Sequence, residues 1–476
     1  MSEPDLRRLD LSHAALSLAQ QRLWFIDAAD RGAATYHVPL LLRWLEPLDP
    51  AALATALSAV VRRHHVLRTV YRLEGGQPVQ QVLAPRNVDI RVVDLAGDPD
   101  AERRLSTEAA AAGCEPFDLS ADLPLRCTVW LGAPDGDAAL LLFHHIAIDG
   151  WSLSVLFADL DAAYTAALAG RPADLPALSV QYADFAVWDR AVSTGEAARR
   201  RLTTRAGELK PYLGPVVLGR REPHRPGPAK RLGGQVVFEL SDPLRADLYR
   251  LATRLRATPF VVLLAAYQAV LQRWCGRAEF LVGTVAANRP HPAVESLIGF
   301  FVNTVPLRCA PRAAESFATL CADVRAEAFR GLTHQLIPYD QLSADVGGSE
   351  PLVRVGFALQ NMPAWDTDRP RWHPPIQLPT GTAKFDLFLI FEERPDCVVG
   401  TVEYATDMYS SQTAAQLAGH VQVLLAAAVA DPDTPVCRLP ITARQPGAQP
   451  PCVLVGPARD LVSARMAQMA LIGGVA

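Results

Sequence analysis

Residues 140–152 read LLLFHHIAIDGWS, in which an apolar run ends at two adjacent histidines and an aspartate and a glycine follow. The run from Leu140 to Phe143 is typical of a buried strand, and successive side chains on a strand point to opposite faces. If His144 and His145 end that strand, one ring faces a cavity and the other faces the protein body. We therefore predict one working imidazole held in place by a structural neighbour.

The segments on either side of the histidine pair predict two paired strands followed by a helix. Residues 125–131 read as a strand, and a turn-rich connection joins them to the strand 138–143. After the pair, apolar residues recur at helical spacing over 153–168, and Gly170 ends the run. Helix and strand signals alternate along the whole chain, so we predict an α/β (α+β) fold.

Three more helices and one more strand carry clear sequence signals. Asp49 and the proline after it supply an N-cap and a first-turn proline for one helix. Thr258, again followed by proline, begins a strongly apolar helix in the same way, and another helix follows from Phe317. Residues 280–286 read FLVGTVA, which is typical of a buried strand.

Shifts in composition divide the chain into four parts. We predict an N-terminal lobe over residues 1–189, which carries the histidine pair, and a C-terminal lobe over 235–442. Between them, residues 190–234 are charged and proline-rich, which predicts a crossover linker. The tail, 443–476, is rich in proline and glycine and then amphipathic. A loosely docked helix, a flexible end and a partner contact all fit that pattern.

Bulk composition excludes several classes of protein. A chain of 476 residues favours two or more packing units over a single core. Half of the residues are hydrophobic and a fifth are charged, which is an ordinary globular composition. The formal net charge is −4 and the basic residues form no stripe, so we expect no nucleic-acid binding.

Cysteine and hydropathy patterns indicate the cytoplasm. The eight cysteines are scattered, with no CxxC pair and no metal-ligand spacing, so free thiols in a reducing compartment are expected. The N-terminus lacks the basic-then-apolar order of a signal peptide. No apolar run approaches the roughly 20 residues needed to cross a bilayer, so no membrane association is expected. We predict a cytoplasmic protein.

His145 is the candidate general base of the opening segment. A neutral imidazole accepts a proton near neutral pH because its ordinary pKa is about 6.5, which suits acyl transfer. A free α-amine has a pKa of about 8 and is partly nucleophilic without help. With an amine acceptor, the histidine would remove the proton from the tetrahedral ammonium or hold the nucleophile. An alcohol acceptor would depend on the base more strongly.

Asp149 has two interpretations from the residues alone. It orients a histidine, or it pairs with an arginine from another segment and fixes the loop; we favour the ion pair. A negative charge at the start of the following helix is favourable in either case. Adjacent histidines also occur as metal half-sites or at surfaces, and His64-His65 is a second such pair. A zinc site would want further ligands at fixed spacing, and none lies close by.

The wider sequence resembles the condensation domains of nonribosomal peptide synthetases, whose core signature is HHxxxDG. That signature is complete here in His144, His145, Asp149 and Gly150. Further motifs follow in family order, so the resemblance covers most of the chain. They are SLAQQRLW at 17–24 (family SxAQxRLW), RHHVLRTVY at 63–71 (RHExLRTxF), YADFAVW at 182–188 (YxDFAxW), IGFFVNT at 298–304 (IGxFVNT), HQLIPYD at 334–340 (HQDxPFE) and FALQN at 357–361.

By this resemblance, the fold is two chloramphenicol-acetyltransferase-like lobes that form a V-shaped pseudodimer around a central tunnel. The resemblance places His145 at the tunnel centre, while His144 and Asp149 hold its loop. Arg289 is expected to pair with Asp149, and Gly150 to leave room for the substrate arm. The candidates for lining the tunnel are Trp151, Ser152, Asn303 and Asn361.

The resemblance implies a condensation enzyme of nonribosomal peptide biosynthesis, a route to antibiotics and other secondary metabolites. It would transfer a carrier-bound aminoacyl, peptidyl or acyl donor to an amine or alcohol, forming an amide or an ester. A donor peptidyl carrier protein would deliver its substrate at one tunnel mouth and an acceptor carrier protein at the other. The 4′-phosphopantetheine arm belongs to the carrier, and the chain itself needs no metal, nucleotide or flavin. A monomer is expected.

Some residues depart from the family pattern. Residues 201–219 lack the usual YWxxxL pattern, and His65, Leu336 and Tyr339 are atypical. These positions bear on substrate or partner preference more than on chemistry. Two other functions stay open: a stand-alone acyltransferase that uses a free small-molecule acceptor, and a catalytically silent domain that recruits carriers or other enzymes.

Related domain types are distinguished by their motifs. Epimerisation domains share HHxxxDG but carry a GWFT-type segment that is absent here, and cyclisation domains replace both histidines with aspartates. Silent members tend to have lost the second histidine, which is present as His145. We therefore favour condensation. We also expect a free-standing enzyme, because the residues after Pro440 do not resemble the start of an adenylation or carrier domain.

Overall fold

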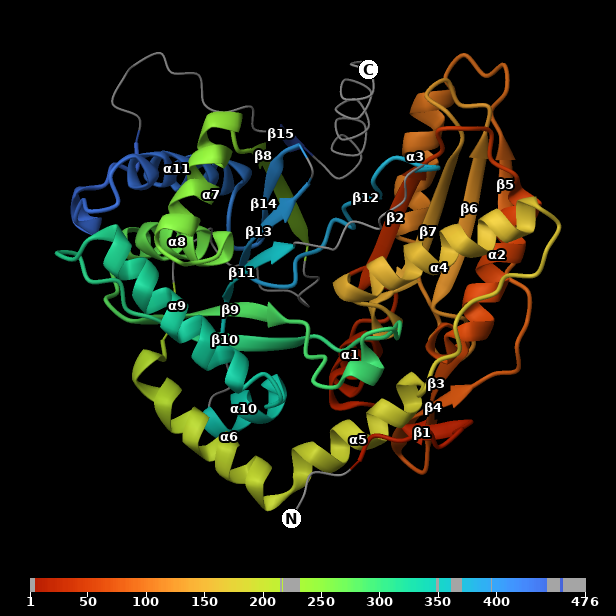
Figure 1. The fold of residues 1–476 in the computed structure, drawn as a ribbon, viewed down its shortest axis with the longest axis horizontal. Helices are drawn as coiled ribbons and strands as arrows, with labels where there is room; N and C mark the ends of the chain where they lie inside the picture. Colours follow the sequence, from red (N-terminus) through yellow and green to blue (C-terminus); the bar gives the residue numbers. More distant parts are fainter. Residues whose placement is uncertain are drawn as a thin grey trace.

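The chain folds into two lobes that stand side by side and join at the lower end of the view in Figure 1. The computed structural model describes residues 5–214, 216, 232–347, 351–360, 370–394 and 396–442, together with the backbone of 454–456. Each lobe has its own buried hydrophobic core. The mixed helix and sheet content confirms the predicted α/β class.

The N-terminal lobe is built on a five-stranded sheet that helices cover on both faces. Its strand order is β12-β2-β7-β6-β5, so the strand that leads to the histidine pair is central. Helices α2 and α4 pack on one face of this sheet, and α3 packs on the other. The elements are β1 (His13–Ala15), α1 (Leu18–Ala29), β2 (His37–Arg43), α2 (Pro50–Arg63), η1 (His65–Arg68), β3 (Thr69–Glu74), β4 (Gln77–Val82), β5 (Ile90–Asp94), α3 (Ala101–Gly113), β6 (Leu125–Leu131), β7 (Ala138–His144), η2 (His145–Ala147), α4 (Gly150–Leu168), α5 (Tyr182–Thr194) and, from the second half of the chain, β12 (Ile376–Gln377).

The C-terminal lobe is built on a seven-stranded sheet with the order β10-β9-β11-β13-β14-β8-β15. Helices α7, α8, α9 and α11 share one apolar core with this sheet. The elements are α6 (Glu196–Leu209), η3 (Lys210–Tyr212), β8 (Gly233–Glu239), α7 (Asp242–Arg254), α8 (Pro259–Cys275), β9 (Phe280–Ala286), η4 (Pro292–Val294), β10 (Asn303–Cys309), α9 (Phe317–Thr333), α10 (Tyr339–Val346), β11 (Val355–Gln360), β13 (Leu387–Glu393), β14 (Val398–Ala405), α11 (Ser411–Ala430), η5 (Val436–Arg438) and β15 (Leu454–Gly456).

Several local predictions are confirmed in detail. The strands predicted at 125–131 and 280–286 are β6 and β9 with those bounds. Asp49 is the N-cap of α2 and Thr258 that of α8, each followed by proline in the first turn. The single described helix long and apolar enough to cross a membrane is α11, and its side chains Leu417, Val421 and Leu424 are buried in the C-terminal core. The helix predicted at 153–168 is α4, which begins earlier, at Gly150.

Helices connect the two lobes at their base. The segment 190–234, predicted as a crossover, starts inside α5 and contains the whole of α6. Arg205 on α6 is buried; it donates to the Pro306 carbonyl over 2.8 Å and lies 3.1 Å from the Glu327 carboxylate on α9. The atypical residues after the YxDFAxW motif therefore begin as an ordered helix that docks on the C-terminal lobe. Residues 217–231 lie outside the described part of the chain.

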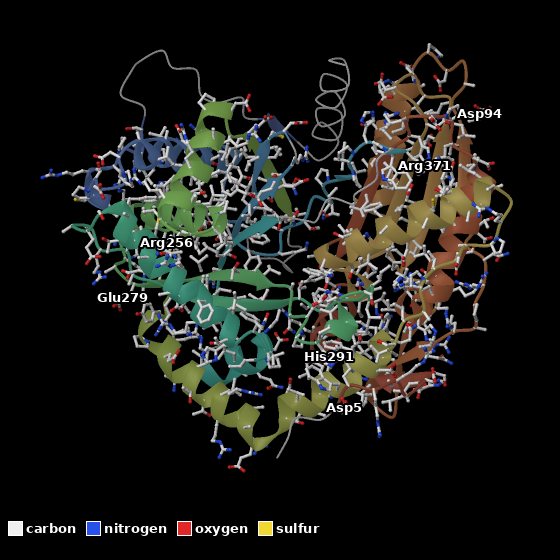
Figure 2. All side chains as sticks on the ribbon, in the orientation of Figure 1. Asp5, Asp94, Arg256, Glu279, His291 and Arg371 are labelled. Atoms are coloured by element: carbon white, nitrogen blue, oxygen red, sulfur yellow. The ribbon has the colours of Figure 1, made fainter. Side chains whose placement is uncertain are left out.

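A second crossing returns the chain from the C-terminal lobe to the N-terminal sheet. Strand β12 pairs antiparallel with β2, and just ahead of it Trp372 is buried against Trp44 and Phe157. Arg371 lies 3.3 Å from Asp161 on α4, and Figure 2 shows it against the N-terminal lobe. The two lobes are thus connected at the base by helices and higher up by a strand.

The tail predicted at 443–476 contributes one described element. Strand β15 pairs antiparallel with β8 at the edge of the C-terminal sheet. The amphipathic piece that follows lies outside the described residues.

Candidate active site

The histidine pair lies where β7 turns into a short 3₁₀ helix. His144 is the last residue of β7, opposite His37 on β2, and His145 is the first residue of η2. The expectation that both histidines end the strand is therefore corrected. The turn arises because the His145 N–H donates to the Tyr36 carbonyl over 2.7 Å and the His144 Nδ1 accepts from the Ile146 N–H over 3.2 Å.

One hydrogen bond determines the tautomer of His145. Its Nδ1 lies 2.6 Å from the carbonyl oxygen of Ile148. A carbonyl only accepts, so Nδ1 carries the hydrogen and Nε2 carries the lone pair of the neutral ring. No described residue bonds Nε2, and the Phe300 ring stands edge-on to the imidazole with centroids 5.1 Å apart. Nε2 is thus an open acceptor in a fixed orientation.

The surroundings keep the His145 ring neutral. Burial lowers its pKa to about 3, and the positive charge of Lys384 acts in the same direction. The bond to the Ile148 carbonyl opposes them, because that carbonyl would also accept from the protonated ring. At neutral pH the imidazole of the free protein is therefore a hydrogen-bond acceptor at Nε2 and a weak base.

The His144 ring points into the N-terminal lobe. It is buried between His37 and Phe117, with ring centroids 6.2 and 5.9 Å away. Its Nδ1 accepts from Ile146, so the hydrogen is on Nε2, which lies 3.6 Å from the Asp27 carboxylate on α1. The two adjacent rings differ in burial and partners, and His144 has a packing environment rather than an open nitrogen.

Asp149 is the centre of a buried polar network at the start of α4. As the N-cap of α4, its Oδ1 accepts from the Ser152 N–H over 2.9 Å, and its Oδ2 accepts from the Phe301 N–H over 3.0 Å. Arg289 Nη2 lies 3.1 Å from Oδ1, and the exposed fractions of the two side chains are 3% and 0%. The expected Arg289–Asp149 pair is therefore formed, and it joins the histidine loop to the second half of the chain.

Arg289 also holds the bridging segment, which we define as residues 287–302. It donates to the backbone carbonyls of Val294 and of Leu297, the latter over 2.8 Å. Its guanidinium stacks over the Phe301 ring, 4.0 Å from the centroid. Because Val294, Leu297, Ile298, Phe300 and Phe301 belong to the N-terminal hydrophobic core, this arginine fixes the bridging segment against the histidine loop.

Two residues of the SxAQxRLW motif support the same loop, a role that residue patterns alone did not reveal. Gln20 on α1 donates from Nε2 to the Ile146 carbonyl over 3.2 Å and to Tyr71 over 3.1 Å. Ser17 caps α1 and bonds the hydroxyl of Tyr182, which in turn donates to the Phe300 carbonyl. The available signal was the motif itself.

The tunnel candidates occupy different environments. Ser152 is fully buried: its hydroxyl bonds Asp149 over 2.7 Å and accepts from the Gly299 N–H over 3.0 Å, so it belongs to the polar network instead of lining open space. Trp151 is part-exposed and donates to the Glu295 carbonyl over 2.9 Å. Asn361 lies outside the described residues.

Asn303 lies at the start of β10 and holds the loop before α10. Its amide donates to the carbonyls of Gln335 and Ile337 over 2.8 and 2.6 Å, and its Oδ1 accepts from the Tyr339 N–H over 3.2 Å. Gly150 faces open space, because a Cβ added there would meet no atom within 4 Å. No described residue fills the space that a side chain at position 150 would occupy, so packing within the described protein does not require glycine there.

A small cleft opens between the base of the two lobes. Arg22 on α1 reaches across it, 3.4 Å from Asp340 and 4.8 Å from the Tyr339 ring centroid. Burial raises the pKa of Asp189, which also lines the cleft, to about 6. Phe300 lies between this cleft and the His145 ring. Among the residues that the structure describes, no group of His, Cys, Asp or Glu is arranged to hold a metal ion.

The fold and this site define a class. Two chloramphenicol-acetyltransferase-like lobes, with an HHxxxDG loop held against the bridging segment, are the architecture of condensation domains. The sequence pattern of the Condensation domain family matches residues 11–446. The chain therefore belongs to the condensation domains of nonribosomal peptide synthetases, as the motifs predict.

Its relatives are large synthetases of which it matches a part. Phosphinothricin tripeptide synthetase PhsC of Streptomyces viridochromogenes is 36% identical over 448 residues, which are 90% of this chain and 40% of that protein. Malpinin synthetase of Mortierella alpina is 33% identical over 430 residues, 88% of this chain and 6% of that protein. The chain thus spans less than half the length of either relative.

Solved structures share the fold. The X-domain from teicoplanin biosynthesis has a TM-score of 0.79 at 26% identity, and the match covers 92% of this chain and 100% of the X-domain chain. The first condensation domain of the calcium-dependent antibiotic synthetase, in complex with a substrate analogue, has a TM-score of 0.78 at 22% identity, covering 90% and 98% of the two chains.

Proposed function

We propose that this chain catalyses condensation: it transfers the acyl group of a carrier-bound thioester to an amine or alcohol, forming an amide or an ester. The observation that carries the proposal is the fixed tautomer of His145. Its Nδ1–H is held by the Ile148 carbonyl, which leaves the Nε2 lone pair as the acceptor that a nucleophile requires.

The lowered pKa of His145 distinguishes two roles for its imidazole, which are to accept a hydrogen bond and to accept a proton. With a pKa of about 3 in the free protein, the imidazole cannot take a proton from an ordinary ammonium group, whose pKa is near 8. A neutral amine needs no proton removed before attack. Nε2 therefore serves first to accept a hydrogen bond from the amine and to aim its lone pair at the thioester carbon.

Proton transfer follows bond formation. The amine nitrogen bonds to the carbonyl carbon, and the carbon–sulfur bond then breaks. The nitrogen loses a proton to Nε2 of His145, which returns it to the departing thiolate. An alcohol must lose its proton during attack, so a weak base at His145 favours amine acceptors and amide products.

The buried network around Asp149 would act by positioning His145. Asp149 and Ser152 join the loop after His145 to Gly299 and Phe301. Arg289 neutralises the aspartate and holds the bridging segment. The polar atoms of Asp149 and Ser152 and both Nη atoms of Arg289 are bonded within the protein, so we assign these side chains to the frame of the site.

Partners follow from the thioester substrate. A donor peptidyl carrier protein would present its acyl group on a 4′-phosphopantetheine arm, and an acceptor carrier protein would present the nucleophile from the opposite side. The open space at Gly150 supports passage of such an arm close to the start of α4. The chain would act as a monomer, because its two lobes together build the site.

A recruitment role is the second candidate, supported by likeness to the teicoplanin X-domain. That domain was solved in complex with OxyB, with a TM-score of 0.78 and 25% identity to this chain. A recruitment domain does not need an oriented acceptor nitrogen. The open Nε2 of His145 therefore favours condensation.

The direct test uses His145→Ala with a donor-loaded carrier and either a free or a carrier-bound acceptor. We expect product formation to fall by roughly 10²-fold or more. His13→Ala removes an exposed histidine on β1 and is the matched control. Unchanged turnover in His145→Ala would contradict the catalytic assignment. Equal use of free and tethered acceptors would exclude the need for a second carrier.

A further inference from the structure

Lys384 lies on the segment that returns from the N-terminal sheet to the C-terminal lobe. Only three lysines occur among the 46 basic residues of the chain, and the described ones are Lys384 and Lys210. Lys384 falls between β12 and β13, in a turn that we define as the return turn, residues 378–386. Figure 1 shows this connection running between the two lobes.

The pairing of β12 with β2 places the start of the return turn near the histidine pair. Gln377 is opposite Leu40 on β2, and the Leu378 N–H donates to the Pro39 carbonyl over 2.9 Å. Two residues further along β2 is His37, which is opposite His144. The chain therefore leaves the N-terminal sheet at the end where β7 delivers the histidines.

Contacts on both sides hold the return turn. On the N-terminal side, Cys114 Sγ lies 3.7 Å from the Thr380 carbonyl. On the C-terminal side, the Gly233 N–H donates to the Gly381 carbonyl over 2.8 Å. A Cβ at Gly233 would come within 2.2 Å of the Thr382 backbone, so only glycine permits this approach.

The backbone under Lys384 has its own anchor. The Lys384 N–H donates over 2.9 Å to the carboxylate of Glu403, which is buried on β14. Its side chain is close enough to His145 that the ammonium lowers the pKa of the imidazole. A rigid turn of the C-terminal lobe thus presents a cation to a ring of the N-terminal lobe.

We propose that Lys384 stabilises the negative charge that develops on the carbonyl oxygen of the donor thioester during attack. This assignment rests on the proposed condensation function and adds a residue to it. His144 is the other titratable group whose charge acts on His145, and Asp27 lies beside His144. Lys384 is therefore the cation of this group.

Distances within the reaction support the assignment. The nucleophile must lie about 3 Å from Nε2 of His145 to share a hydrogen bond, and about 3 Å from the carbonyl carbon to attack it. The carbonyl oxygen is then within a few ångströms of the imidazole. The return turn lies at the same end of the sheet as the histidine pair, and lysine is a compact point charge suited to stabilising that oxygen.

The electrostatics explain why a cation beside a catalytic histidine is useful. In the free protein the ammonium disfavours protonation of His145 and keeps Nε2 available as an acceptor. When the tetrahedral oxyanion forms, its negative charge offsets the positive charge of the Lys384 ammonium. His145 can then accept the proton of the attacking nitrogen and pass it to the thiolate as the carbon–sulfur bond breaks. Lys384 takes no part in this proton transfer.

The test compares Lys384→Met and Lys384→Arg with Lys210→Met, which removes an exposed lysine on η3, outside the return turn. We expect Lys384→Met to lower kcat by roughly 10²-fold with little change in KM. Lys384→Arg retains the charge and should recover part of the loss, and Lys210→Met should match the wild type. Full turnover in Lys384→Met would overturn the assignment. A rise in KM alone, confined to acceptors with a free carboxylate, would overturn it by indicating acceptor binding instead.

Histidine NMR supplies a readout that does not depend on turnover. In Lys384→Met the pKa of His145 should rise by about one unit, and Lys210→Met should leave it unchanged. An unmoved His145 titration would overturn the placement of Lys384. Failure of the condensation function itself would look different: the wild-type protein would form no product from any donor, although the His145 titration would still respond to Lys384→Met.

Discussion

His64 and Asp159 form a buried pair that supports the bridging segment. His64 Nε2 lies 2.6 Å from Asp159 Oδ2, and its Nδ1 accepts from the Ile298 N–H over 3.3 Å. The ring must be neutral to accept at Nδ1, and burial lowers its pKa. Both ring nitrogens of His64 are thus bonded within the protein.

His64→Ala is expected to lower the free energy of unfolding by about 2 to 4 kcal/mol. The substitution leaves the Ile298 N–H without its acceptor and removes one partner of Asp159, although Arg63 stays 2.8 Å from that carboxylate. Denaturant unfolding measures the loss. His65→Ala is the control, because the part-exposed His65 is bonded through its backbone to Gln181. Equal losses in the two variants would contradict the assigned role.

The Arg289–Asp149 pair makes a prediction about coupling. Arg289→Met should lower the free energy of unfolding by about 3 to 5 kcal/mol, because it leaves the Asp149 carboxylate buried without a counter-charge. Adding Asp149→Asn to that variant removes the uncompensated charge, and asparagine still caps a helix. The double variant should therefore unfold at higher denaturant concentration than Arg289→Met alone.

An exposed pair provides the comparison for this cycle. Arg200 and Glu196 lie 2.9 Å apart on α6, with exposed fractions of 71% and 82%. Arg200→Met should change stability little, since solvent screens such pairs. If the two substitutions at Asp149 and Arg289 proved additive, the pair would not be the unit that holds the bridging segment.

Local elements could be predicted from sequence because their signals are local. Residues 280–286 are a mainly apolar run, residues 125–131 alternate between buried and part-buried side chains over most of their length, and each segment forms the strand predicted. Asp49 caps its helix because its carboxylate is adjacent to the amides it accepts from. His145 could be named as a candidate for the same reason, since the HHxxxDG signature runs without a break from residue 144 to residue 150.

Long-range partners were not predictable from local pattern. Trp372 completes the N-terminal core, and the charge of Lys384 acts on His145, although both residues come from far along the chain. Nothing in the residues around either position indicates such a partner. Arg289 was paired with Asp149 through the family resemblance alone. Ser152 was expected at the tunnel because it follows the signature, but position in sequence does not show that its hydroxyl is enclosed by Asp149 and Gly299.

Stability should fall as the pH falls below about 6.5. Burial lowers the pKa of His37 and of His65 to about 4 and that of His145 to about 3. Unfolded histidines take up protons near pH 6.5, whereas these rings stay neutral in the fold, so the unfolded state binds more protons across that window. For the buried His37 alone, the loss between pH 6.5 and 5 is about 2 kcal/mol.

Asp189 acts against this trend and provides the control. Its pKa is raised to about 6, so the folded state binds a proton there before the unfolded state does, which adds stability as the pH falls. The urea midpoint of the wild type should therefore be lower at pH 5 than at pH 7. The difference between the two midpoints should be larger in Asp189→Asn. A wild-type midpoint that is unchanged or higher at pH 5 would contradict the prediction.

Gly150→Ala should separate stability from function. A methyl group at Gly150 meets no protein atom within 4 Å, and alanine is favoured over glycine in a helix by about 0.5 to 1 kcal/mol. The variant should be slightly more stable than the wild type. If the phosphopantetheine arm passes Gly150, the same methyl displaces the thioester, and turnover should drop about tenfold or more. Gly419→Ala, with equally open space on α11, should gain similar stability at full turnover. Full turnover in Gly150→Ala would place the arm elsewhere.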